Sequence, residues 1–183
     1  SGFTCCNPWG QPNAKEMIIR HFLLALIQSY SLSSKSKELA ILIDPDKVSI
    51  EGLESLIQSI NLSSANFIFV GGSLVHGVEV DSIIESIKMH TDLLVILFPG
   101  SGLQIASNAD AILFLSLLSG RNPDFLIGHQ VMSAPYIKNR GIESIATGYI
   151  LVDGGVETTA SYISNSKPIP SDKPQIAAAT ALA

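Results

Sequence analysis

The feature that most constrains the fold is residues 39–47, where a short apolar run stops abruptly at charged side chains. The run is continuous and rich in Ile and Leu, which is typical of a strand buried on both faces of a parallel sheet. Pro45 cannot donate to a strand ladder and favours an extended conformation for Asp44, so the strand is predicted to end there. The carboxylates of Asp44 and Asp46 and the Lys47 ammonium therefore emerge where a buried strand ends.

Apolar runs of this kind recur along the chain and predict a parallel sheet. The predicted strands are residues 39–43, 66–70, 93–98, 111–115 and 149–152. The first three begin about 27 residues apart, which is about the length of one βα unit. Because each run ends in a polar or glycine-rich turn and helical segments intervene, we expect helices outside a parallel sheet.

Helical periodicity and capping signals fill the intervals between these runs. The predicted helices are residues 14–30, 48–60 with Ser49 as the cap, 80–87, one that starts at Asn122-Pro123, and 175–183. Pro135 should kink or end the fourth of these helices, because proline removes a hydrogen bond from a helix interior.

About five βα units are visible, whereas a closed (β/α)8 barrel needs about 200–250 residues. The sheet is therefore either open or part of an incomplete barrel. The alanine-rich helix 175–183 has no cap at its end, which favours the incomplete barrel. We predict an α/β fold of the (β/α)8 TIM-barrel type, represented by roughly its first five βα units and an N-terminal helix.

Composition and charge argue against several classes of function. The net charge of −5, without a dense Lys/Arg cluster, argues against nucleic-acid binding. No apolar run reaches the roughly 18 residues that a membrane span needs. Cys5 and Cys6 are adjacent, so they form neither a metal spacing nor a disulfide framework, and we expect a cytoplasmic protein. The 183 residues fit an irregular lead-in at 1–13 and one domain at 14–183.

The ends of the first two predicted strands carry the candidate metal ligands. Gly71-Gly72-Ser73 follows the second strand, and parallel strands place Asp44 and Ser73 at the same edge of the sheet. One carboxylate and one hydroxyl suit a Mg²⁺ ion that keeps its waters and shares a substrate phosphate. A structural interpretation remains open: Asp44 and Asp46 shape a turn and cap the next helix, and the glycines serve only the turn.

Several segments in order resemble the geranylgeranylglyceryl phosphate and heptaprenylglyceryl phosphate synthases, which are prenyltransferases on a (β/α)8 barrel. The matching segments are residues 42–47, 70–73, 98–101, 119–128 and 147–155, followed by 176–183. Each segment is a modest match alone, but a chance match of all of them in order is improbable. The chain is most similar to the branch that includes many Bacteroidetes-type proteins.

The resemblance implies a reaction, its substrates and part of the site. Similar enzymes transfer a prenyl group from a polyprenyl diphosphate to the C3 hydroxyl of sn-glycerol 1-phosphate and form an ether. The Mg²⁺ ligands of the family fall on Asp44 and Ser73, and we assign the adjoining Asp46, Lys47 and Gly72 to substrate binding. A lipid substrate also implies transient contact with a membrane surface. We expect a homo-oligomer when the protein is full length.

A prenyl tail requires a long apolar groove near the strand ends. Phe98, Phe114, Leu117 and Leu118 are candidates to line it. Ordinary core packing is the alternative role for these side chains.

Two departures from the family limit what the resemblance implies. The family binds glycerol phosphate through a tyrosine and a glutamate on a sixth strand and through later glycine-rich turns, which this sequence does not contain. We therefore expect the catalytic group on that strand and no activity from this fragment alone. The order His129-Gln130 also differs from the expected Gln/Lys-His, so we interpret His129 as a histidine on a helix surface. Another phosphate-binding TIM-barrel enzyme and a non-catalytic remnant are the alternative functions.

Overall fold

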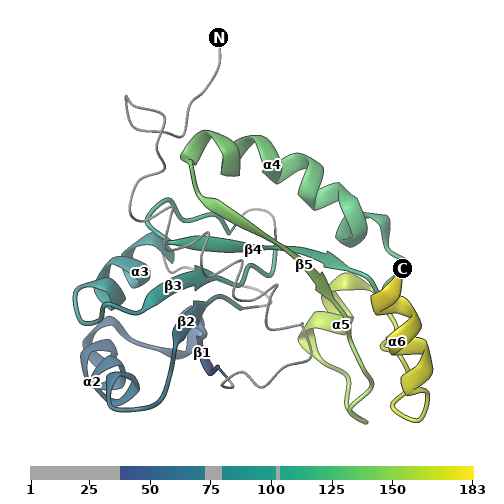
Figure 1. The fold of residues 1–183 in the computed structure, drawn as a ribbon, viewed down its shortest axis with the longest axis horizontal. Helices are drawn as coiled ribbons and strands as arrows, with labels where there is room; N and C mark the ends of the chain where they lie inside the picture. The colour runs from purple at the N-terminus through teal and green to yellow at the C-terminus, as the bar shows by residue number, and fades with distance from the viewer. Residues whose placement is uncertain (1–37, 73–79, 102–103) are drawn as a thin grey trace, which may run out of the picture. The chain divides into compact units, whose positions relative to one another are not determined.

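The computed structural model describes residues 38–72, 80–101 and 104–183, and the unit described below is Ala40–Ala183. Its centre is one parallel sheet of five strands in the order β1-β2-β3-β4-β5 (Figure 1). The strands are β1 (Ala40–Ile43), β2 (Phe67–Val70), β3 (Leu94–Leu97), β4 (Ala111–Leu117) and β5 (Glu143–Tyr149). Sequential order with every neighbour parallel is the arrangement of successive strands in a (β/α)8 barrel.

Helices and two short helical turns flank this sheet and the cavity described below. They are α2 (Ile50–Asn61), α3 (Val80–Lys88), α4 (His129–Arg140), α5 (Thr159–Ser164) and α6 (Pro174–Leu182), with a 3₁₀ turn η1 (Pro45–Lys47) and a π-helical turn η2 (Asp124–Gly128). Figure 1 shows α2, α3 and α4 along the outer side of the strands. Ser49 caps α2, because its hydroxyl accepts a hydrogen bond from the Gly52 amide at 3.2 Å.

The alternation of side chains divides the sheet into a packed face and a face that bounds a cavity. Ile43, Val70 and Leu97 are paired across three neighbouring strands and are buried in the cluster formed with the helices. Leu42 and Leu113 belong to the opposite set and line the cavity described below. Successive residues of a strand point to opposite faces, so the continuous apolar runs serve both surfaces.

The strand pairings differ in length, and this difference opens the sheet on one side of β4. The β3–β4 pairing covers Ile96↔Ala111 and Leu97↔Ile112, whereas β4 and β5 pair over seven residues, from Ala111↔Glu143 to Leu117↔Tyr149. Within the described residues, the second half of β4 therefore has a strand partner on its β5 side only. The cavity extends along this half of β4.

Most predicted elements are confirmed, with small shifts at their ends. The runs at 39–43, 66–70 and 93–98 form β1, β2 and β3, and the run at 111–115 continues as β4 to Leu117. The helices predicted at 48–60, 80–87 and 175–183 are α2, α3 and α6. The predicted lead-in at 1–13 and helix at 14–30 lie outside the described residues.

The prediction of the fifth strand is wrong. We expected it at 149–152, but β5 spans Glu143–Tyr149 and ends where the predicted strand begins. Its side chains alternate between exposed and partly buried positions, with Ile145 buried, so it lacks the continuous apolar run of the other strands. Val152 instead forms an isolated bridge with Ile169.

Of the two expected effects of Pro135, a kink or an end of the helix, the end does not occur, since α4 continues through this residue to Arg140. The carbonyl that loses its partner belongs to Val131, whose side chain is 65 % exposed. On the solvent side of a helix, water can satisfy such a carbonyl. The helix ends instead at Gly141, which adopts the left-handed conformation with φ 67°.

Candidate active site at the carboxyl edge of the sheet

Asp44 stands at the carboxyl end of β1 and shapes the turn that follows. Its Oδ1 accepts a hydrogen bond from the Asp46 amide at 3.2 Å, and its Oδ2 lies 3.0 Å from Lys47 Nζ. The Asp44 side chain is 25 % exposed and that of Lys47 is 79 % exposed. The structural interpretation of Asp44 is therefore correct as far as the turn is concerned. Asp44 also lines the cavity, so the turn holds a carboxylate at its wall.

Two glycines at the end of β2 allow neighbouring groups to approach closely. The Gly71 amide donates to the Ile43 carbonyl at 3.1 Å, and a Cβ on Gly71 would overlap the carbonyl oxygen of Phe98. A Cβ on Gly72 would lie 2.8 Å from Asp44 Oδ1. Gly71 is thus required for the contact between strand ends, whereas Gly72 keeps space open beside the carboxylate.

The loop after β3 supplies the next part of the wall. Phe98 stacks on Phe69 with ring centroids 6.1 Å apart and meets Tyr149 edge-on at 6.0 Å. The Gly100 amide donates to Gln104 Oε1 at 2.8 Å, which holds the turn that follows Phe98. Aromatic side chains from β2, the β3 end and the β5 end therefore meet at one edge of the sheet.

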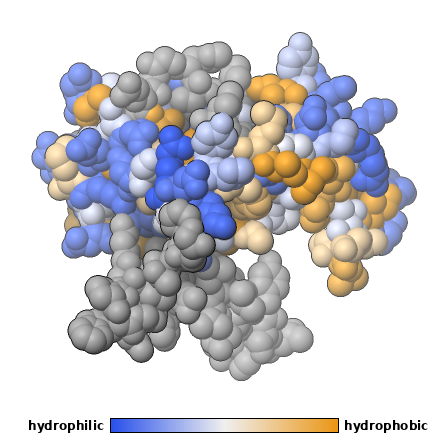
Figure 2. Space-filling model, turned by 90° about the horizontal axis from the view of Figure 1, so that it is seen from above, coloured by the Kyte–Doolittle hydropathy of each residue, from blue (hydrophilic) through white to orange (hydrophobic). Residues whose placement is uncertain are grey.

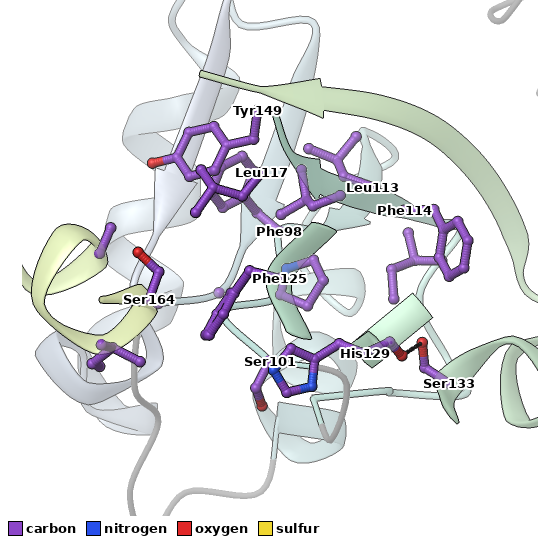
Figure 3. A pocket seen from close by; sticks show the side chains of 18 of the residues that line it. Phe98, Ser101, Leu113, Phe114, Leu117, Phe125, His129, Ser133, Tyr149 and Ser164 are labelled. Atoms are coloured by element: carbon purple, nitrogen blue, oxygen red, sulfur yellow. Dashed lines mark hydrogen bonds between the residues drawn. The ribbon is translucent and has the colours of Figure 1, made fainter. Parts of the chain in front are cut away.

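These groups surround a cavity of about 340 Å³ with a predominantly apolar wall. Its polar end contains Asp44, Lys47 and Gly72. The apolar wall includes Leu42, Phe98, Ile105, Ile112, Leu113, Phe114, Leu115, Leu117, Phe125, Ile137, Tyr149, Leu151 and Ile163. Figure 3 shows Phe98, Leu117 and Tyr149 grouped above Phe125 and His129, with Phe114 and Ser133 farther along the wall. Such a cavity can hold an extended apolar group with a charged group at one end.

A π-helical turn positions the wall that faces the sheet. The Asn122 side chain accepts from the Asp124 amide at 3.1 Å and begins η2, which continues directly into α4. The rings of Phe125 and His129 meet edge-on at 4.8 Å, and both residues line the cavity. Such π turns occur frequently at functional sites. His129 is half-buried at the start of α4, and the side of the helix on which it lies is the one that lines the cavity.

Gln130 joins this turn to the sheet. Its side-chain nitrogen donates to the carbonyls of Leu115 and Phe125, the latter at 3.3 Å. Gln130 is 7 % exposed, and its Oε1 has no hydrogen-bond partner among the described residues. The amide therefore ties η2 to β4 and fixes where the aromatic pair stands.

The structure brings together some of the residues that the sequence predicted to bind metal or substrate. Asp44, Lys47 and Gly72 lie together at the polar end, whereas Asp46 is exposed and is not among the lining residues. Ser73 lies outside the described residues. Within the described part of the chain, no group of three or more His, Cys, Asp or Glu side chains is placed to hold a metal ion.

Of the four residues predicted to line an apolar groove, three line the cavity and one does not. Phe98, Phe114 and Leu117 line the cavity, whereas Leu118 does not, because its side chain fills the space where Gly148 would carry a Cβ. Sequence reasoning missed Phe125 and Tyr149. The Asn-Pro helix start indicated the element that carries Phe125, but no sequence signal indicated that the following turn would face the strand ends.

A sequential parallel sheet with outer helices and a cavity at its carboxyl edge defines part of a fold of the (β/α)8 class. Comparison with family models then identifies the group: residues 33–183 match the PcrB family. The chain belongs to this family.

Related proteins carry a consistent name. The chain is 50 % identical over 147 residues to a geranylgeranylglyceryl phosphate synthase of Chitinophaga pinensis, covering 80 % of this chain and 58 % of that protein. It is 48 % identical over 160 residues to the protein of the same name from Spirosoma linguale, covering 87 % and 64 %. The chain thus spans about three fifths of the length of these relatives.

Solved structures agree with the fold. Wild-type GGGPS from Thermoplasma volcanium matches with a TM-score of 0.78 at 31 % identity, over 87 % of this chain and 63 % of that chain. The (S)-3-O-geranylgeranylglyceryl phosphate synthase from Thermoplasma acidophilum, in complex with its substrate sn-glycerol-1-phosphate, matches with a TM-score of 0.76 at 32 % identity. That match covers 92 % of this chain and 64 % of the other.

Proposed function

We propose that this chain is part of a prenyltransferase that joins a polyprenyl diphosphate to sn-glycerol 1-phosphate and forms an ether-linked prenylglyceryl phosphate. The names of its relatives support this activity, and the Thermoplasma acidophilum structure in complex with sn-glycerol-1-phosphate supports the acceptor. The family resemblance of the sequence motifs supports the diphosphate donor and the Mg²⁺ dependence.

The observation that carries the proposal is the asymmetry of the cavity. One end presents the Asp44 carboxylate and the Lys47 ammonium, and the remaining wall is predominantly apolar and aromatic, with the polar side chains of Ser101, His129, Gln130, Ser133 and Ser164 among it. A prenyl diphosphate has the same asymmetry, with a charged head and a hydrocarbon tail. The head would lie near Gly72 and the tail between Phe98 and Phe125, which buries the hydrocarbon away from water.

The residues at the polar end fit a Mg²⁺ ion. Asp44 offers a carboxylate that is partly exposed to the cavity, and the missing side chain at Gly72 leaves space beside its Oδ1. A single carboxylate, together with the hydroxyl of Ser73 that the sequence predicts as a ligand, is a sufficient protein contribution, since Mg²⁺ commonly keeps waters and binds substrate phosphates. When bound, the ion would supply Lewis-acid stabilisation of the negative charge that develops on the leaving diphosphate.

Lys47 would bind and orient the diphosphate. Its ammonium lies 3.0 Å from Asp44 Oδ2 and is largely exposed, so a small movement brings it to a phosphate oxygen. Charge-assisted bonds of this kind are stronger than neutral hydrogen bonds. Asp46 remains a predicted substrate-binding residue at the rim of this end. The group that accepts the proton of the glycerol hydroxyl is expected on a sixth strand, as the family resemblance implies.

A phosphate-handling barrel enzyme with a small polar substrate is the second candidate function. The aromatic side chains of Phe98, Phe125 and Tyr149 in the cavity wall argue against this function, because contact with them adds little binding free energy for a small polar substrate. A non-catalytic remnant is the third candidate, and it predicts that no prenyl donor binds in the cavity.

The test is the Asp44→Asn variant of the protein expressed from its complete gene. This change keeps the size of the side chain and its capping oxygen but removes the charge that binds Mg²⁺. We expect turnover with geranylgeranyl diphosphate and sn-glycerol 1-phosphate to fall on the order of a hundredfold or more. Ser73→Ala should cost less, because water can replace a neutral hydroxyl ligand. Turnover is measured against Mg²⁺ concentration and normalised to folded protein.

Asp92→Asn is the matched control. Asp92 is exposed and precedes β3, at the opposite edge of the sheet. This variant should keep the turnover and Mg²⁺ dependence of the parent. Near-normal turnover with unchanged Mg²⁺ dependence in Asp44→Asn would overturn the metal assignment, and a parent protein without prenyl transfer would overturn the function itself.

A further inference from the structure

The outer side of η2 and α4 exposes several large apolar side chains. Four large side chains on it are more than half exposed: Ile127 at 59 %, Val131 at 65 %, Met132 at 70 % and Tyr136 at 60 %. We call these four residues the α4 surface. They lie opposite the buried side of the helix, and Figure 2, which views the molecule from the side on which α4 lies in Figure 1, shows hydrophobic side chains gathered there.

The same segment is basic within an acidic chain. Residues 125–142 contain no Asp or Glu, and the last turn of α4 carries Lys138 and Arg140. The whole chain has a net charge of −5. Asp124 and Glu143 flank the segment but stand outside it. An apolar surface with cations at its border matches an anionic lipid bilayer, which attracts basic residues and accepts shallow apolar side chains.

The opposite side of this segment faces the cavity. Phe125 and His129 line it from η2 and the start of α4, and Ser133 and Ile137 line it from the next turns. One helical segment therefore separates the apolar cavity from the α4 surface. Among the described residues, no helix has the combination of length and apolarity needed to cross a bilayer. Contact with a membrane through α4 would accordingly be shallow, with the helix lying in the interface.

We propose that the α4 surface docks the protein onto anionic membranes, with Val131, Met132 and Tyr136 inserted among the lipids and Lys138 near the headgroups. Docking through this surface would bring the cavity wall close to the layer in which a long prenyl substrate is dissolved. The surface is a further property beyond the proposed reaction, and its binding to lipid can be measured without turnover.

The α4 surface of a second copy is a poorer partner for this surface. If α4 packed against α4 of another molecule, Lys138 and Arg140 would meet a helix that offers no carboxylate. Like charges at a contact disfavour association, whereas an anionic headgroup supplies the missing opposite charge. Charge complementarity therefore favours lipid.

The experiment is co-sedimentation of the protein with vesicles of phosphatidylglycerol and phosphatidylcholine, and with vesicles of phosphatidylcholine alone. We expect binding to the anionic vesicles that weakens as salt is raised, because salt screens surface charge. The Val131→Ser/Met132→Ser double variant should bind about tenfold more weakly or worse, since each buried methylene contributes to insertion. Lys138→Gln should weaken binding by about fivefold, the value for one cation near a charged bilayer.

The matched control is Leu62→Ser/Met89→Ser. It also removes two exposed apolar side chains, 90 % and 70 % exposed, but from the ends of α2 and α3. This control should bind vesicles like the parent, and circular dichroism should report the same helix content in all variants. Equal binding by the Val131→Ser/Met132→Ser variant and the parent would overturn the proposal. Absence of binding by the parent protein to the anionic vesicles would also overturn it. A dimer that the same double variant dissociates would then assign the α4 surface to a second copy of the chain.

Discussion

Two aspartate–lysine pairs stand at opposite edges of the same sheet and differ in almost every physical respect. Asp110 precedes β4 at the amino edge, and its side chain is 5 % exposed. Its two carboxylate oxygens each have a partner at 2.8 Å, Lys88 Nζ for Oδ1 and the Val95 amide for Oδ2. Asp44 follows β1 at the carboxyl edge, is 25 % exposed, and faces a lysine that is largely in solvent.

The difference between the two pairs shows what each edge of the sheet contributes to stability and to the candidate active site. Lys88 Nζ also donates to the Asn108 carbonyl at 2.7 Å, so the charges at the amino edge are neutralised within the protein and bind α3 to the start of β4. At the carboxyl edge the Asp44 carboxylate borders an open cavity and the unfilled space at Gly72. In (β/α)8 proteins the amino edge serves stability and the carboxyl edge serves chemistry. The two pairs follow this division.

Asp110→Ala should produce the largest change in stability. It removes the opposite charge of the Lys88 ammonium, which keeps only its bond to the Asn108 carbonyl, and leaves the Val95 amide without the Asp110 carboxylate; breaking a buried pair in this way costs about 3 kcal/mol or more. Urea unfolding measures the loss, and turnover per folded molecule should be unchanged. An unaltered free energy of unfolding would remove the distinction between the two edges.

Asp44→Asn should give the reverse pattern. Its hundredfold loss of turnover, predicted above, should come with a change of only about 0.5 kcal/mol in the free energy of unfolding, because an exposed ion pair contributes little and asparagine still caps the turn. The same urea titration measures this change. A loss of stability as large as that of Asp110→Ala would assign Asp44 to structure and not to chemistry.

The glycine pair offers a sharper comparison within the carboxyl edge. Gly71→Ala introduces a methyl group that collides with the Phe98 backbone and should destabilise the protein by about 2 kcal/mol or more. The three atoms nearest to a Cβ at Gly72 belong to the Asp44 carboxylate, which can rotate, so we expect Gly72→Ala to fold and to lose about tenfold in turnover through misplacement of that group. Thermal unfolding and turnover, measured on both variants, should give opposite rankings.

Lys47→Gln should have the smallest effect on stability. Its ion pair with Asp44 is exposed, and pairs of this kind contribute about 0–1 kcal/mol. The KM for the prenyl diphosphate should rise severalfold, because an ammonium that binds phosphate is lost. Steady-state kinetics at fixed Mg²⁺ concentration measures it. An unchanged KM would leave Lys47 with a role in the turn alone.

The sequence by itself determined the parallel sheet and the position of Asp44 at the end of β1. The apolar runs that form β1, β2 and β3 are local signals, because these strands carry apolar side chains on both faces, although Leu42 of β1 is 52 % exposed. The Ser49 cap and the turn after Asp44 are also local, since each depends on hydrogen bonds between residues two or three positions apart. Sequence patterns capture such features well.

Only the tertiary structure decided β5 and the far wall of the cavity. The alternating side chains of Glu143–Tyr149 become a strand because β4 offers seven paired positions, a contact that no local pattern encodes. His129 is polar and stands on a helix, yet it lines the cavity because Gln130 ties η2 to the Leu115 carbonyl. Lining residues from separate elements meet through packing over long sequence distances, and the sequence of each element alone does not reveal its neighbours.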